Sequence, residues 1–142
     1  MTKSSKAGKT QYLNGLNIVE IGSRISVTVC ASLLAEAGAQ VFFIEPPEGQ
    51  VQGSGKWASR GLYAAGKSSV VADSENADDR ALVSALIAAA DVVLISSDIG
   101  GDGWNDLVAE HGETTIICDF TAFGQTGPMV GKPFSDALVQ SM

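Results

Sequence analysis

The stretch from Asn17 to Gln50, NIVEIGSRISVTVCASLLAEAGAQVFFIEPPEGQ, decides the fold. Ile18, Val19 and Ile21 form a short apolar run, which is typical of a strand buried on both faces. Apolar residues then recur at helical spacing, which predicts a helix whose apolar face consists of Val27, Cys30, Leu33, Leu34 and Ala37. Gly38 follows, where a left-handed residue commonly ends a helix, and Gln40 to Ile44 reads as a second strand. Two strands joined by one helix predict a parallel βαβ unit.

The remaining chain repeats this alternation. Further strands are predicted at 69–72, 91–95 and 114–118, and helices at 77–89 and 104–110. Asp73 or Ser74 is the expected cap of the helix at 77–89, whose apolar side consists of Ala77, Ala81, Leu82, Leu86 and Ile87. Loops rich in Gly, Pro or Ser are expected at 45–60, 96–103 and 120–133. The sequence therefore predicts an α/β fold, a Rossmann-like and mainly parallel sheet flanked by helices.

The two ends of the chain differ from its middle. Residues 1–12 are polar, basic and without periodicity, which predicts a disordered tail before a single domain at 13–142. Ser135 is a candidate N-cap for an apolar helix that has run for about two turns when Met142 ends the sequence. This ending leads us to expect an N-terminal part of a longer protein, with an incomplete core.

Composition excludes several classes of function. The chain has 142 residues, 45% of them hydrophobic, and a formal charge of −7, which argues against a nucleic-acid-binding role. The apolar runs are too short for a membrane span, and no secretory signal is recognisable, so we expect a cytoplasmic protein without a membrane partner. Cys30 and Cys118 are expected to be small core residues rather than a disulfide or a metal pair.

The usual catalytic motifs of α/β proteins are missing. The turn after the first strand reads GSRISV and lacks the second glycine of G-x-G-x-x-G, and there is no P-loop or G-x-S-x-G elbow. One histidine, His111, and no cysteine cluster make a zinc site improbable on composition, and His111 is expected to be an exposed residue at a helix end. Dehydrogenase, P-loop and hydrolase functions are therefore disfavoured.

Three stretches together resemble the class III CoA-transferases, a family that includes formyl-CoA:oxalate and carnitine CoA-transferases and α-methylacyl-CoA racemase. NGLNIVEIGSRISVTVCASLLAEAGAQVFFIEPPEG is similar to the opening of these proteins. AAGKSSVVAD resembles their Asn-Arg-Gly-Lys-Arg-Ser-Val-x-Leu-Asp stretch, and AFGQTGPMVGKPFSDALVQSM resembles Gly-Phe-Gly-Gln-Thr-Gly-Pro followed by Arg-Pro-Gly-Tyr-Asp. The three matches occur in the family's order and spacing, and they cover the first third or so of a family member.

The resemblance implies the chemistry. Family members form interlocked homodimers with a Rossmann-like large domain, and an aspartate attacks an acyl-CoA to give a mixed anhydride before CoA is exchanged. That aspartate lies beyond the position of Asp136, so no catalytic residue is expected within these 142 residues. The expected partners are CoA and acyl-CoA, the remainder of a longer chain, and a second copy. The CoA thioester is a substrate, and neither a covalently bound cofactor nor a metal is implied.

The same resemblance assigns CoA-binding positions to this chain. They are Ile25, Ser26, Ala64, Ala65, Gly66, Lys67, Ser96, Ser97, Gly124, Gln125, Lys132, Phe134 and Ser135. Lys67 is either a contact for a CoA phosphate or a solvated surface lysine, and Gly124 to Pro128 either shape the loop near the thioester or form a plain turn. Asp119 is expected to be a carboxylate at a strand end. Ser96 and Ser97 stand where the family usually has Asn-Phe, which removes an aromatic group from the CoA groove.

Other functions remain open at this stage. Phe134-Ser135-Asp136 replaces the Gly-His-Asp of the racemases, and a serine cannot exchange a proton near neutral pH, so a racemase is disfavoured. Ile25 and the SSDIG sequence at 96–100 would also fit a non-catalytic CoA-binding or interaction domain. A generic nucleotide-binding domain is a weaker alternative because the phosphate-binding loops are absent.

Overall fold

The computed structural model describes residues 11–47, 63–98, 102–132 and 141. A five-stranded sheet with the order β3-β2-β1-β4-β5 forms its centre, and every neighbouring pair of strands is parallel. The strands are β1 (Asn17–Ile21), β2 (Gln40–Glu45), β3 (Lys67–Val71), β4 (Val92–Ile95) and β5 (Ile116–Asp119). The predicted α/β fold with a parallel sheet is confirmed.

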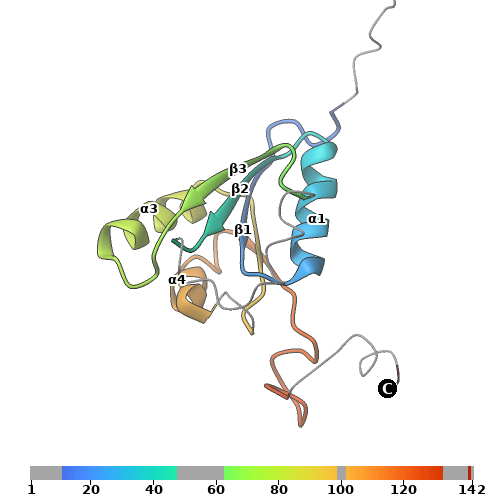
Figure 1. Cartoon of the computed structure of the whole chain (residues 1–142), viewed down its shortest axis with the longest axis vertical. Coiled ribbons are helices and arrows are strands. Elements are labelled where there is room, and N and C mark those ends of the chain that lie inside the picture. Colours follow the sequence, from blue (N-terminus) through green and yellow to red (C-terminus); the bar gives the residue numbers. More distant parts are fainter. Residues whose placement is uncertain (1–10, 48–62, 99–101, 133–140, 142) are drawn as a thin grey trace, which may run out of the picture.

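Helices cover both faces of the sheet. The helical elements are α1 (Ile25–Glu36), α3 (Ala77–Ala88), the 3-10 turn η1 (Asp102–Trp104) and α4 (Asn105–Glu110). Figure 1 shows α1 on one side of the sheet and α3 with α4 on the other. This three-layer arrangement explains why the central strands are mainly apolar on both faces rather than alternating regularly with polar residues.

Two apolar clusters lie on the two faces. Ile18 packs with Val27 and Ala31 beneath α1, whereas Val19 and Ile21 pack beneath α3 and α4. Because successive side chains of a strand point to opposite faces, the same register places Glu20 on the α1 side with Ile18. A carboxylate therefore lies inside the layer between α1 and the sheet.

The predicted apolar helix faces were wrong at four positions. Leu33 of α1 is 61% exposed and Leu82 of α3 is 48% exposed, and Ala77 and Ala81 of α3 are exposed as well. The fully buried residues of these helices are Val27 and Ala31 in α1, and Val83 and Ile87 in α3. Both helices carry apolar residues around most of their circumference, so periodicity alone did not single out the narrow stripe that meets the sheet.

Several element boundaries also moved. β3 begins at Lys67 rather than Ser69, and β5 runs from Ile116 to Asp119 rather than over 114–118. Asn76, and neither Asp73 nor Ser74, caps α3: its side chain accepts hydrogen bonds from the backbone N–H groups of Asp78 and Asp79.

The two cysteines differ from each other. Cys118 is exposed, so its prediction as a core residue is wrong, because β5 is the last strand of the described sheet and has no neighbour there on its far side. Cys30 is half-buried against the cluster beneath α1. Burial raises the pKa of the Cys30 thiol, with smaller contributions in the same direction from Cys118 and Glu20, so the thiol is held in its neutral form.

Some expectations fall outside the described residues. They are most of the tail at 1–12, most of the loop at 45–60, and the helix starting at Ser135. The division between tail and domain stays a prediction; Gln11 and Tyr12 already belong to the turn that leads into β1. In the described ranges no helix is long and apolar enough to cross a membrane. Among those same residues no three potential metal ligands gather.

Candidate functional site

The site lies at the carboxyl end of the sheet, where β1 and β4 are neighbours. The chain leaves β1 toward β2 on one side, and it leaves β4 toward β5 on the other. Between two such strands the connections diverge and leave a crevice, which is the usual ligand position in open α/β sheets. Here the segments that diverge are Gly22 to Arg24 and Ser96 to Asp98.

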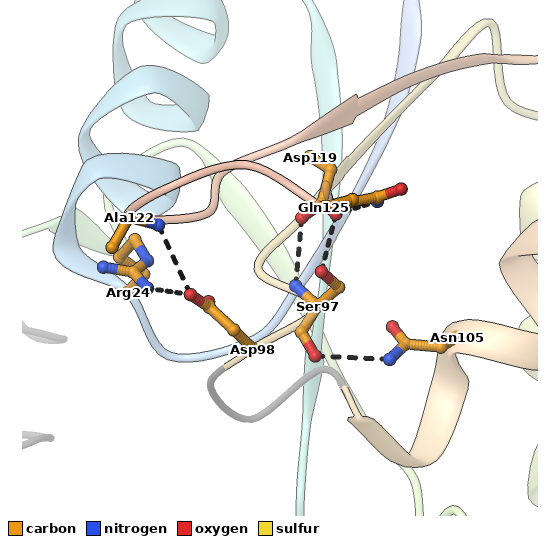
Figure 2. A network of polar contacts seen from close by, with 7 residues as sticks. All are labelled: Arg24, Ser97, Asp98, Asn105, Asp119, Ala122 and Gln125. Atoms are coloured by element: carbon orange, nitrogen blue, oxygen red, sulfur yellow. Dashed lines mark hydrogen bonds and ion pairs between the residues drawn. The ribbon is translucent and has the colours of Figure 1, made fainter. Parts of the chain in front are cut away.

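An ion pair joins the two segments. The Arg24 Nη2 atom lies 2.6 Å from Asp98 Oδ2, and the two side chains are 11% and 30% exposed. The same Asp98 oxygen accepts a hydrogen bond of 3.4 Å from the backbone N–H of Ala122, in the loop after β5. Arg24 is also the residue immediately before α1. The pair therefore connects the start of α1, the end of β4 and the loop after β5 (Figure 2).

A second network centres on Asp119, at the end of β5. Its carboxylate accepts from Ser97 N at 3.1 Å and from Ser97 Oγ at 2.6 Å, and the amide of Gln125 donates to it as well. Asn105, the first residue of α4, donates to the carbonyl of Ser97 at 3.2 Å (Figure 2). The expectation of a carboxylate at a strand end is confirmed, and its function here is to hold two loops together.

Two pockets open beside these networks. The first has a volume of about 460 Å³ and contains four of the expected CoA-binding residues, Ser97, Gly124, Gln125 and Lys132. Asp98 also lines it, so an anionic ligand would meet one carboxylate and one lysine there. The second, of about 590 Å³, shares Ser97 and Gln125 and lies between α4 and the end of β5.

The other expected site residues lie elsewhere. Ile25 and Ser26 are exposed in the first turn of α1, and Ala64 to Gly66 form an exposed turn before β3. Ser96 is fully buried behind the crevice. Phe134 and Ser135 lie outside the described residues, together with the Phe134-Ser135-Asp136 triplet that bears on the racemase alternative. All thirteen CoA-binding assignments stay predictions.

Lys67 is not a solvated surface lysine. Its side chain is 3% exposed, and its Nζ atom lies 2.7 Å from Oε2 of Glu20, which is fully buried. The reason is that β3 starts at Lys67, so the side chain points under α1 rather than out of a loop. A contact between Lys67 and a CoA phosphate would require this buried pair to separate.

Glu20 and Arg24 were missed by sequence reasoning. For Glu20 a signal existed, because a carboxylate within a doubly buried strand must find a charged or hydrogen-bonding partner. For Arg24 and Asp98 the signal was weaker: opposite charges directly follow two strands, but their contact depends on β1 and β4 being neighbours.

His111 was expected to be exposed at a helix end. It does follow the last residue of α4, but it is partly buried, and its Nε2 atom lies 3.1 Å from Ser84 Oγ of α3. Its contact is with a neighbouring helix and not with the crevice.

Comparison with known proteins gives this geometry its context. The sequence model of CoA-transferase family III matches residues 13–142. The chain belongs to CoA-transferase family III. Relatives of known activity include the succinate–glutarate CoA-transferase of Agrobacterium fabrum, which is 31% identical over 148 residues. The succinyl-CoA–D-citramalate CoA-transferase of Chloroflexus aurantiacus is 30% identical over 143 residues.

The match covers most of this chain and a smaller part of each relative. It includes 92% of the chain in both cases, but 37% of the Agrobacterium and 35% of the Chloroflexus protein. Among solved structures, a CAIB/BAIF family protein from Brucella suis superposes with a TM-score of 0.73 at 29% identity, over 93% of this chain and 39% of that one. The resemblance to this family on sequence motifs is therefore confirmed, and so is the fold.

Proposed function

We propose that this chain is the N-terminal, CoA-binding part of a cytoplasmic CoA-transferase that moves CoA between small carboxylic acids. The observation that carries the proposal is the family match over residues 13–142, combined with a pocket at the crevice between β1 and β4. The named relatives are transferases for succinate and glutarate and for D-citramalate, all of them di-acids. A dicarboxylic acid is accordingly the acceptor class we propose.

In this proposal the 142 residues bind and orient CoA, and they do not supply the nucleophile. The family's catalytic aspartate would follow the region matched here and form the mixed anhydride with the acyl group. The backbone N–H groups and Lys132 of the 460 Å³ pocket would hold a polar part of CoA. A homodimer and a larger fold around this sheet belong to the same proposal.

A non-catalytic CoA-binding domain is the second candidate, and one observation favours it. Arg24 is the first basic residue after β1. It forms an ion pair with Asp98, and Asp98 lines the pocket. The Asp98 carboxylate repels an anionic ligand, and its ion pair with Arg24 weakens the attraction of the guanidinium for that ligand. Such a site would bind CoA weakly and need not support turnover.

Calorimetry and a transferase assay, both on the full-length protein that the gene encodes, separate the two candidates. Titration of CoA is expected to give saturable binding, and succinyl-CoA with glutarate or citramalate is expected to give a new acyl-CoA by chromatography. Binding without turnover on any dicarboxylic acid favours the non-catalytic domain. Absence of CoA binding contradicts both.

A further inference from the structure

A buried ionic network links β1, α1 and β3. Lys67 Nζ lies 2.7 Å from Glu20 Oε2 and donates to the carbonyl of Thr28 at 2.9 Å. Thr28 Oγ1 donates to the other carboxylate oxygen, Glu20 Oε1, at 2.7 Å. The Lys67 ammonium also lies 5.9 Å from the centre of the Phe43 ring, within the range of a cation–π contact. Both charges are thus paired and hydrogen-bonded within the layer between α1 and the sheet.

Stability alone does not account for this network. Desolvating two charges costs several kcal/mol each, and apolar replacements of similar volume are often neutral or stabilising. What the network does supply is a fixed geometry, because each of its hydrogen bonds has a defined direction. It fixes the first residue of β3 to α1 at Thr28.

The turn that precedes β3 is tied to the same helix at its other end. Ser32 Oγ of α1 lies 2.9 Å from the carbonyl oxygens of both Tyr63 and Thr28, so its single proton is shared between the turn and the helix. The Lys67 N–H donates to the carbonyl of Ala64 at 3.1 Å. Gly66 closes the turn at a φ of 81°, a left-handed conformation that glycine adopts without strain. Residues 64–66 are therefore held from both sides by α1, through Ser32 and through Lys67.

We propose that Glu20, Lys67 and Ser32 are positioning residues that dock the 64–66 turn on α1 in the conformation in which it would contact CoA. The inference rests on the proposed CoA-binding function and on the family resemblance, which assigns CoA contacts to Ala64, Ala65 and Gly66. In this proposal the Lys67 side chain holds the turn by binding Glu20 and the Thr28 carbonyl of α1, and it does not contact a phosphate of CoA. Because the turn is already ordered in the free protein, CoA binding does not include the entropy cost of ordering it.

The gentlest test replaces Ser32 by alanine. Ser32→Ala removes the contact with Tyr63 and keeps α1 intact, because alanine is the best helix former. We expect CoA to bind roughly tenfold more weakly, which is what ordering about one additional residue costs. The matched control is Ser84→Ala in α3, which removes the Ser84–His111 contact of 3.1 Å and should leave CoA affinity unchanged.

The second test removes the buried charges. Lys67→Met alone would orphan Glu20 and could unfold the chain, so the variant is Glu20→Gln with Lys67→Met, which leaves no unpaired buried charge. The expected results are a weaker CoA affinity and a lower protection of the backbone amide at position 67 against hydrogen exchange. The Ser96 amide, which donates to Ile21 at 3.1 Å between β1 and β4, serves as the reference and should keep its protection. Val83→Ala, a core variant on the other face of the sheet, controls for general destabilisation.

The outcomes separate the two proposals. If both variants match the wild type in CoA affinity and in amide protection at position 67, the positioning role is overturned. Equal losses of affinity in Val83→Ala and in the double variant would also overturn it, because stability alone would then explain the result. If the wild-type chain does not bind CoA, the proposed function fails, and a lower amide protection at position 67 in the variants would still show that these residues dock the turn.

Discussion

At the scale of single residues, Gly38 shows how tightly the first βαβ unit is closed. It follows α1 with a φ of 110°, as the sequence predicts for a residue that ends a helix. A Cβ atom at this position would lie 2.6 Å from Cβ of Gln11. Glycine is therefore required at this position both by the left-handed backbone and by the close approach of Gln11. Only the backbone requirement could be predicted from the sequence, because Gln11 was assigned to a tail.

Gly38→Ala is expected to lower the free energy of unfolding by about 2 kcal/mol or more, since left-handed backbone costs a non-glycine residue about 1–2 kcal/mol and the contact with Gln11 adds to it. Gly15→Ala is the control: its φ is 93°, but a Cβ atom there would have nothing within 4 Å. Urea unfolding of both variants measures the difference. Equal losses would mean that the contact with Gln11 costs nothing.

At the scale of elements, periodicity identified every described strand and helix approximately, and the tertiary contacts decided their ends. β3 begins at Lys67, two residues before its predicted start, because its ladder with β2 already pairs Lys67 with Val41, and no local pattern encodes that partner. Leu82 carries the helical spacing of a core residue, but the sheet meets α3 at Val83 and Ile87 instead. Helix capping was misplaced for a related reason: Asp73, Ser74 and Asn76 are all good caps, and geometry selected Asn76.

Asn76→Ala is expected to cost about 1 kcal/mol of stability, because two N–H groups at the start of α3 lose their acceptor. Ser74→Ala is the comparison, since sequence reasoning had named Ser74 as a cap, and it should change stability by less than about 0.5 kcal/mol. Thermal unfolding by circular dichroism reports both. A larger loss for Ser74→Ala than for Asn76→Ala would reassign the cap.

At the scale of the whole molecule, the strand order is what creates the candidate site. Ser97 and Asp119, 22 residues apart in the chain, meet because β4 and β5 are neighbours, and Arg24 meets Asp98 because β4 lies beside β1. Sequence motifs and the family resemblance identified Ser97, Gly124, Gln125 and Lys132 as members of one site, and the structure places all four around one pocket. They could not reveal that Arg24 is paired or that Lys67 is buried, because both facts depend on contacts across the sheet.

The charge of the molecule sets a condition on the proposed ligand. CoA is an anion and the chain carries a formal charge of −7, so binding must come from local donors rather than from the overall field. Among the described residues that line the 460 Å³ pocket, Lys132 is the basic one. It is exposed, so its substitution should leave the fold intact.

Calorimetric titration of CoA into the 142-residue chain, comparing wild type, Lys132→Ala and Lys132→Arg, tests the central claim most directly. We expect saturable binding by the wild type, a loss of about tenfold in Lys132→Ala, as for one charge-assisted contact, and near wild-type affinity in Lys132→Arg. The claim that this domain binds CoA would be contradicted if the wild-type chain shows no saturable binding with CoA at concentrations up to about 1 mM. Binding that Lys132→Ala leaves unchanged would place CoA elsewhere on the molecule.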